Sequence, residues 1–226
     1  MHNAFIRGLT SIYLQCVHVE TSPGDIPDFV AFCKVWGELL QDHHETEEID
    51  VFPFLEQGAG VPGLMKSSFE EHRAFDAGLV EFMTYIWKVE AGENKYSGQK
   101  LKTVIESFAP TMHEHMVNEI PTLLALDKYS DKVNWGEYWK KKAAEIFDKK
   151  SADPATKTGK VIMLPFVLTC TDATFEDGVY QWPPNFPWIA KMITRYYYFP
   201  QHGNWWRFGP VDSAGQPREL PFAKAG

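Results

Sequence analysis

Apolar residues recur every three or four positions in four stretches of the first 127 residues, and no other feature limits the fold of this chain as strongly. This spacing places apolar side chains on one face of an α-helix, so each stretch predicts an amphipathic helix. Short polar or glycine-rich segments separate the stretches, which favours an all-α, up-down-up-down four-helix bundle. The stripes carry Phe5, Leu9, Ile12 and Cys16; Phe29, Phe32, Trp36 and Leu40; Phe69, Phe75, Leu79 and Met83; and Leu101, Ile105, Phe108 and Met112.

The second stripe continues toward Phe54, and residues 135–147 predict a fifth helix on the outside of the bundle. The last part of the chain differs in composition, because nine of the 15 prolines follow residue 153 and aromatic residues crowd the segment 175–208. Residues 181–188 and 196–208 are too rich in proline and large aromatic residues for regular helix. We therefore expect a helical bundle over residues 1–150 and an irregular, aromatic-rich extension over residues 151–226 that packs on it and buries its aromatic side chains.

Charge and composition exclude several classes of protein. Hydrophobic residues make up 44% of the chain, which is enough for a core, and the formal net charge of −8 makes a nucleic-acid partner improbable. No apolar run approaches the roughly 18 residues that a membrane span needs, and residues 1–4 do not resemble the start of a signal peptide. Three widely spaced cysteines do not form a disulfide framework. We therefore expect a cytoplasmic protein without membrane or nucleic-acid partners, of open oligomeric state.

Each apolar stripe contains ionisable side chains at positions that the helical period places on the inward face of the helix. Residues four apart lie on one helix face, so a histidine and a carboxylate four residues later can coordinate the same ion. Inward histidine–glutamate pairs on facing helices are also the way carboxylate-bridged di-iron and di-manganese sites are built. The interrupting residues are His2 on the first stripe, His43 and Glu47 on the second, His72 and Asp76 on the third, and His115 and Glu119 on the fourth.

These polar residues are expected at one level along the bundle. His2 and His43 lie about 17 and 18 residues from the first expected turn, and His72 and His115 lie about 20 and 19 residues from the third, so at roughly 1.5 Å per residue their heights agree within a few Å. Burying several imidazoles and carboxylates without partners would cost several kcal/mol. A bound metal removes this cost, and imidazole with carboxylate suits iron, manganese or zinc. The stripes offer no thiolate at this level, which argues against a structural zinc site.

Two residues have open roles at this stage. His44 lies about 100° around the helix from His43, so it is either a residue that orients a ligand or an extra ligand. Asp76 faces inward on the helical period, yet its side chain is short, so it is either a ligand or a neighbour of one.

Several segments carry a resemblance to a known family: His2-Asn3 at the start of the first helix, residues 43–48 (HHETEE) followed by Phe52-Pro53, residues 69–75 (FEEHRAF), and residues 115–119 (HMVNE). They resemble the hemerythrin-like, HHE cation-binding family over about residues 2–127, and most closely its fungal members with a C-terminal extension. The resemblance implies a non-haem di-iron site in a four-helix bundle, with manganese or zinc less suited. The ligands it implies are His2, His43, Glu47, His72, His115 and Glu119, with the two glutamates as bridges.

The chain departs from hemerythrins proper at Asp76, where they have a histidine, and this argues against plain reversible oxygen carriage. The first hypothesis is therefore a di-iron oxygenase or oxidase, an oxidoreductase that activates dioxygen on a small organic substrate. In that case we expect the aromatic extension to line a substrate pocket beside the metal, with Arg207 as a contact for an anion. The other interpretation is that the extension only covers the core. The alternative function is a non-catalytic protein that binds, senses or stores iron or oxygen.

Overall fold

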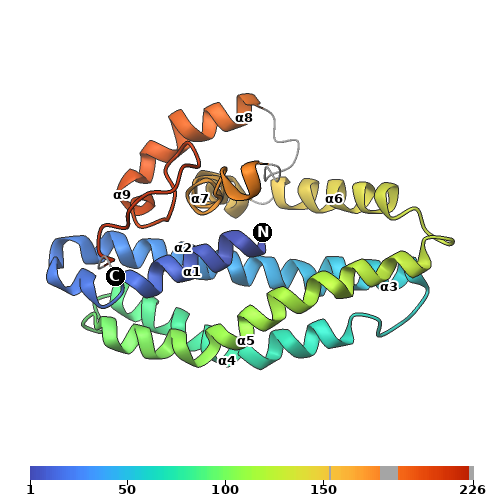
Figure 1. The fold of residues 1–226 in the computed structure, drawn as a ribbon, viewed down its shortest axis with the longest axis horizontal. Coiled ribbons are helices and arrows are strands. Elements are labelled where there is room, and N and C mark those ends of the chain that lie inside the picture. Colours follow the sequence, from blue (N-terminus) through green and yellow to red (C-terminus); the bar gives the residue numbers. More distant parts are fainter. Residues whose placement is uncertain (153, 179–187, 224–226) are drawn as a thin grey trace.

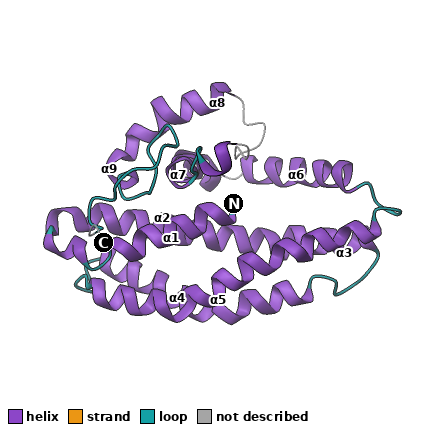
Figure 2. Cartoon of the chain, viewed as in Figure 1, coloured by secondary structure: helices purple, strands orange, loops and turns teal. Residues whose placement is uncertain are grey.

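The computed structural model describes residues 1–152, 154–178 and 188–223, with the backbone alone for residues 147, 148, 150–152 and 154–160. In these residues every regular element is a helix and none is a strand, so the expected all-α class is confirmed (Figure 2). Within the same residues, no helix has both the length and the apolar character that a bilayer span requires.

Four long helices run lengthwise through the molecule: α1 (His2–Gln15), α2 (Ile26–Thr46), α4 (Lys66–Glu90) and α5 (Gly98–Leu124) (Figure 1). Each coincides with one of the apolar stripes that predict helices. α1 packs on α2 and α5, and α4 packs on the same two helices. The buried faces of all four helices therefore enclose one core.

Trp36 of α2 lies in this core and shows how the helices are held together. Its ring lies 5.1 Å from that of Phe82 on α4 and 6.3 Å from that of Phe108 on α5. Its indole nitrogen donates a hydrogen bond to the carbonyl oxygen of Phe5 on α1 at 3.0 Å. Each of these side chains is almost fully buried, and such burial stabilises a fold by about 1.5–3 kcal/mol per large apolar side chain.

The second helix continues beyond α2 without a break. A π-helical turn at Glu47–Val51 leads directly into α3 (Phe52–Ala59), which Gly60 ends in the left-handed conformation at a φ of 68°. The prediction that this helix extends to Phe54 is therefore confirmed. A π-helical turn inserts an extra residue into the helix, and such turns are found frequently at functional sites.

α6 (Trp135–Ala152) lies outside the four long helices, near α3, and confirms the predicted fifth helix (Figure 1). The ring of Tyr138 stacks on that of Phe54 at 3.9 Å, and the indole of Trp135 donates to the carbonyl oxygen of Leu126 at 2.9 Å. These contacts attach α6 to the end of the molecule where α3 and the end of α5 meet.

The extension is more helical than expected. After residue 153 the described chain forms α7 (Pro154–Cys170), α8 (Trp188–Ile193), a π-helical turn (Thr194–Tyr198), a 3₁₀ turn (Phe199–His202) and α9 (Gly203–Trp206). The expectation of an irregular segment over 196–208 was wrong because Pro200 occupies the first turn of the 3₁₀ helix, where a missing backbone N–H costs nothing. The expected irregular segment 181–187 lies outside the described residues.

Part of the extension completes the core of the long helices. Phe166 of α7 lies 6.3 Å from Phe5 and 5.9 Å from Phe32, and Phe208 lies 5.2 Å from Phe29, as distances between ring centres. The expectation that the aromatic residues of the extension are buried fails near α8, because three of them face solvent. Trp188, Tyr196 and Tyr197 are 74%, 65% and 67% exposed.

Candidate metal centre

Four helices bring histidines and glutamates to one place inside the protein. The structure brings together all six side chains that were expected to converge, and it adds His44 to them. Two overlapping groups result, and Glu47 belongs to both of them. The first group contains His2, His43 and Glu47, and the second contains His44, Glu47, His72 and His115.

The first group lies where the start of α1 meets the end of α2. His43 Nε2 lies 3.1 Å from Glu47 Oε1, and the rings of His2 and His43 are 5.4 Å apart. His2 Nε2 lies 3.0 Å from Glu119 Oε2, which brings the expected carboxylate of α5 to this group. The other ring nitrogen of His2 donates to the carbonyl oxygen of Met116 at 3.1 Å and so fixes the ring.

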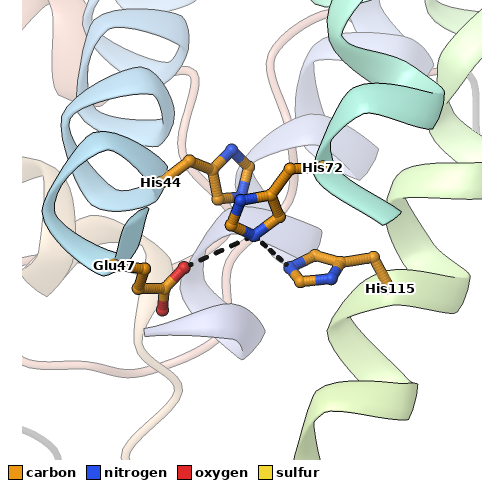
Figure 3. Close-up of side chains that lie close together, drawn as sticks. All are labelled: His44, Glu47, His72 and His115. Carbon is orange, nitrogen blue, oxygen red and sulfur yellow. Dashed lines mark hydrogen bonds and ion pairs between the residues drawn. The ribbon is translucent and has the colours of Figure 1, made fainter. Parts of the chain in front are cut away.

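The second group joins α2, α4 and α5, and all four of its residues are buried (Figure 3). His72 Nε2 lies 3.1 Å from His115 Nε2 and 3.6 Å from Glu47 Oε2. The ring of His44 lies 4.3 Å from that of His72. His44, whose role the sequence left open, therefore lies among the candidate ligands.

Two carboxylates that the sequence analysis missed hold the outer nitrogens of these imidazoles. His72 Nδ1 lies 2.9 Å from Glu48 Oε1, and His115 Nδ1 lies 3.1 Å from Glu71 Oε2. A carboxylate that holds the outer N–H of a histidine fixes the ring and presents the other nitrogen to a metal. Glu48 reaches His72 from within the π-helical turn.

Three buried atoms of the cluster have no hydrogen-bond partner: His43 Nε2, His44 Nε2 and Glu47 Oε2. The approach of His43 to Glu47 is short enough for an ion pair but lacks hydrogen-bond geometry. A buried polar atom without a partner costs about 1–3 kcal/mol, so three of them in one cluster are unusual. A cation in each of the two groups would accept the lone pairs of His43 and Glu47 in one and of His44 and Glu47 in the other, which makes the donor set fit metal ions.

The electrostatics of the cluster favour neutral imidazoles. Burial, followed by the neighbouring imidazoles, holds the pKa of His43 and of His44 well below the usual range, and burial also lowers the pKa of His115. Neutral imidazole is the form that binds a metal. Burial and the nearby Glu119 raise the pKa of Glu47 to about 9.

Glu119 differs from Glu47 although both are buried. Burial raises the pKa of Glu119, but the hydrogen bond from His2 and the surrounding imidazoles outweigh burial and leave this pKa below its ordinary value. In the protein without metal, the surroundings therefore favour the ionised form of Glu119 and the protonated form of Glu47. A bound cation would displace that proton, since a carboxylate binds a metal in its ionised form.

Asp76 does not join the cluster, so the expectation that it faces inward was wrong. Its side chain is exposed on α4, whereas His72, Phe75 and Leu79 form the buried stripe of that helix. The inward position one turn after His72 is filled by Phe75, whose ring lies 5.2 Å from that of His44. The imidazole of His44, from α2, thus lies in the space beside His72 that Asp76 was expected to approach.

In the part of the extension that the structure describes, no Trp or Tyr ring lies against an imidazole of the cluster. Trp206 and Phe208 are buried, and Phe208 packs on Phe29, which lies 14 residues before His43 on α2. Arg207 pairs with Asp25 and Asp28, so its charge is already balanced by two carboxylates. The described extension approaches the cluster through Phe166, which packs on Phe5, whose ring lies 5.3 Å from that of His43.

The fold and the cluster define an all-helical protein with a buried histidine–carboxylate site that could hold metal ions. Over 222 residues the chain is 34% identical to the dimeric xanthone biosynthesis cluster protein R11 of Cryptosporiopsis sp. (strain 8999), an alignment that covers 98% of this chain and 80% of that protein. The chain belongs to the family of that protein. No protein-family model matches the chain, and no solved structure matches it.

Proposed function

We propose that this protein is a hemerythrin-like four-helix bundle with a non-haem di-iron centre, and that it is an oxidoreductase that activates dioxygen on a small organic substrate. The observation that carries the proposal is the buried cluster itself, in which two groups of ligand atoms share Glu47 and three polar atoms lack a partner. The closed packing of α1, α2, α4 and α5 supports the bundle.

In this proposal, the two groups would supply the ligands of two metal positions. His2 and His43 would hold one ion, with Glu119 beside His2, and Glu47 would bridge to the other ion. His44, His72 and His115 would hold that second ion. A pair of non-haem irons supplies redox chemistry with dioxygen, and imidazole with carboxylate is a donor set that suits iron.

The remaining residues prepare this site. Glu48 and Glu71 keep His72 and His115 in one tautomer and one orientation. Aromatic rings enclose the imidazoles and limit the access of water: Phe5 lies beside His43, Phe52 beside His72, and Phe75 beside His44 and His115. An apolar enclosure strengthens every electrostatic interaction within it.

The relative supports an organic substrate, because its name places it in a xanthone biosynthesis cluster. We assign the present protein to secondary metabolism on this ground, with an aromatic compound as the class of substrate. The alternative is a non-catalytic protein that binds iron or oxygen, and the enclosure of the imidazoles by phenylalanines is the observation that favours it.

Metal analysis and oxygen uptake test the proposal. Protein from iron-replete cells should contain two irons per chain, and His43→Ala or His115→Ala should lose them. Oxygen consumption that starts only when an aromatic substrate is added indicates the enzyme, whereas reversible oxygen binding without consumption indicates the alternative. Stoichiometric zinc that is insensitive to both substitutions would contradict the di-iron centre.

A further inference from the structure

An apolar groove of about 370 Å³ lies between α1 and α5, outside the cluster of histidines. Leu9, Ile105 and Met112 are buried side chains that line it, and Ile6 and Ala109 complete its apolar surface. A volume of this size lies within the range that small organic ligands occupy in proteins, and an apolar lining with few polar groups is typical of such sites.

The residues of the two helices explain why side chains do not fill the groove. Ala109 and Pro110 on α5 face Thr10 on α1, and all three are small. The hydroxyl of Thr10 donates to the carbonyl oxygen of Ile6 at 2.8 Å and is therefore satisfied within its own helix. Pro110 has no backbone N–H, so it leaves the carbonyl oxygen of Glu106 without its usual helical donor.

One end of the groove is polar. The hydroxyl of Tyr13 donates to Glu106 Oε1 at 2.7 Å, and Lys102 Nζ lies 3.9 Å from the same carboxylate oxygen. The hydrogen bond to Glu106 raises the pKa of Tyr13, so the phenol keeps its proton and its oxygen can still accept a hydrogen bond from a ligand.

The other end of the groove lies one helical turn from the cluster. Ile6 follows His2 by four residues on α1, and Met112 precedes Met116 by four residues on α5. The carbonyl oxygen of Met116 accepts the hydrogen bond from His2, so these two turns are joined directly. From Ile6 to Tyr13 the groove runs along seven residues, which is about 10 Å of helix at roughly 1.5 Å per residue.

We propose that this groove binds a planar aromatic molecule that carries a hydroxyl group at one end. The apolar lining takes the fused rings, and the oxygen of Tyr13 takes the hydroxyl. The opposite end of such a molecule lies next to the turns that carry His2 and Met116. The proposal that the groove binds such a molecule depends only on the geometry of the groove. The proposal that the bound molecule is the substrate depends on the proposed function.

Equilibrium binding of xanthone and 3-hydroxyxanthone, whose hydroxyl lies at one end of the ring system, to the purified protein tests this inference. Ala109→Phe fills the groove and should weaken the binding of both probes at least tenfold, about 1.4 kcal/mol. Thr10→Phe on the opposite wall is a second filling variant with the same expected result, so the test does not depend on the folding of one variant. Ala77→Phe, at an exposed position of α4, is the matched control and should leave binding unchanged.

Tyr13→Phe separates recognition of the hydroxyl from general packing. It should weaken the binding of 3-hydroxyxanthone several-fold and leave the binding of xanthone unchanged, a difference that a structural defect would not produce. Failure of both probes to bind, or equal affinities in the filling variants and in Ala77→Phe, would overturn the inference.

Metal content measured on the same samples keeps the two proposals apart. Two irons per chain without probe binding would refute the proposed ligand site in the groove and would support the di-iron centre. Probe binding that the filling variants abolish, in protein that takes up no iron, would support the groove and refute the di-iron centre.

Discussion

The Nε2 atoms of His72 and His115 lie 3.1 Å apart, while the Nδ1 atom of each ring lies against a carboxylate. Because a carboxylate accepts hydrogen bonds, both Nδ1 atoms donate, and both Nε2 atoms then carry lone pairs. Two lone pairs at this distance repel each other unless a proton or a metal ion is shared between them. The proposed metal centre therefore has its clearest physical basis in this pair.

His44→Ala should reduce bound iron from two ions per chain to one or none. Its imidazole is buried against His72 and belongs to the second group of ligands. Elemental analysis of the purified variant measures the loss. Asp76→Ala is the control, since its side chain is exposed, and it should retain both ions. Loss of iron in Asp76→Ala with full retention in His44→Ala would reverse the assignment.

Glu71→Gln should weaken metal binding by roughly 10- to 100-fold, because His115 loses the carboxylate that holds its outer N–H. Glu48→Gln should act on His72 in the same way. Competition with a chelator of known affinity measures the change. Glu45→Gln, which alters an exposed glutamate of α2, should bind metal like the wild type. If all three variants behave alike, the two carboxylates do not orient the histidines.

Phe166→Ala should lower the free energy of unfolding by about 3–5 kcal/mol, since it leaves a cavity between α7 and the core of the long helices. Urea denaturation followed by circular dichroism measures the change. Tyr197→Ala removes a side chain that is 67% exposed and should stay within about 0.5 kcal/mol of the wild type. Equal stability of both variants would show that α7 contributes nothing to the cooperative fold.

Asp25→Asn should destabilise the protein more at neutral pH than in acid. Hydrogen bonds from Ser22 and Arg207 hold the pKa of Asp25 below its ordinary value. A carboxyl with a lowered native pKa stabilises the fold above its unfolded pKa of about 3.9, and the effect is lost as the pH falls through the native pKa. Urea unfolding at pH 7 and pH 3 should therefore show a difference from the wild type that is smaller at the lower pH.

The control for this experiment is Asp131→Asn, which removes one negative charge from an exposed turn without removing a partner of Arg207. It should not reproduce the pH-dependent loss. A destabilisation by Asp25→Asn that is equal at pH 7 and pH 3 would mean that the ionised carboxylate is not the stabilising group.

The long helices could be predicted from the sequence because each buries a stripe of apolar residues with the helical period, as Phe5, Leu9 and Ile12 do on α1. The extension could not be predicted in the same way. Pro200 and the neighbouring aromatic residues lower helix propensity, yet tertiary packing of Trp206 and Phe208 against the core overrides that preference.

The convergence of His2, His43, His72 and His115 could be expected because a constant rise per residue fixes the level of each side chain. The direction of the Asp76 side chain could not be predicted. The buried stripe of α4 runs from His72 through Phe75 and Leu79, and a step of four residues from His72 leads to a neighbouring, exposed position. The contact of Glu48 with His72 depends on a π-helical turn, and the residue pattern does not predict such a turn. Glu71 and His115 are 44 residues apart, so only tertiary structure joins them.

The adjacent histidines of α2 have a consequence for the geometry of the proposed centre. His43 belongs to one group of ligands and His44 to the other, and Glu47 of the same continuous helix belongs to both. One continuous helix would therefore supply ligands to both ions, which limits how far apart the two ions could lie. Tilting of α1, α4 or α5 would instead move the remaining ligands, His2, His72 and His115.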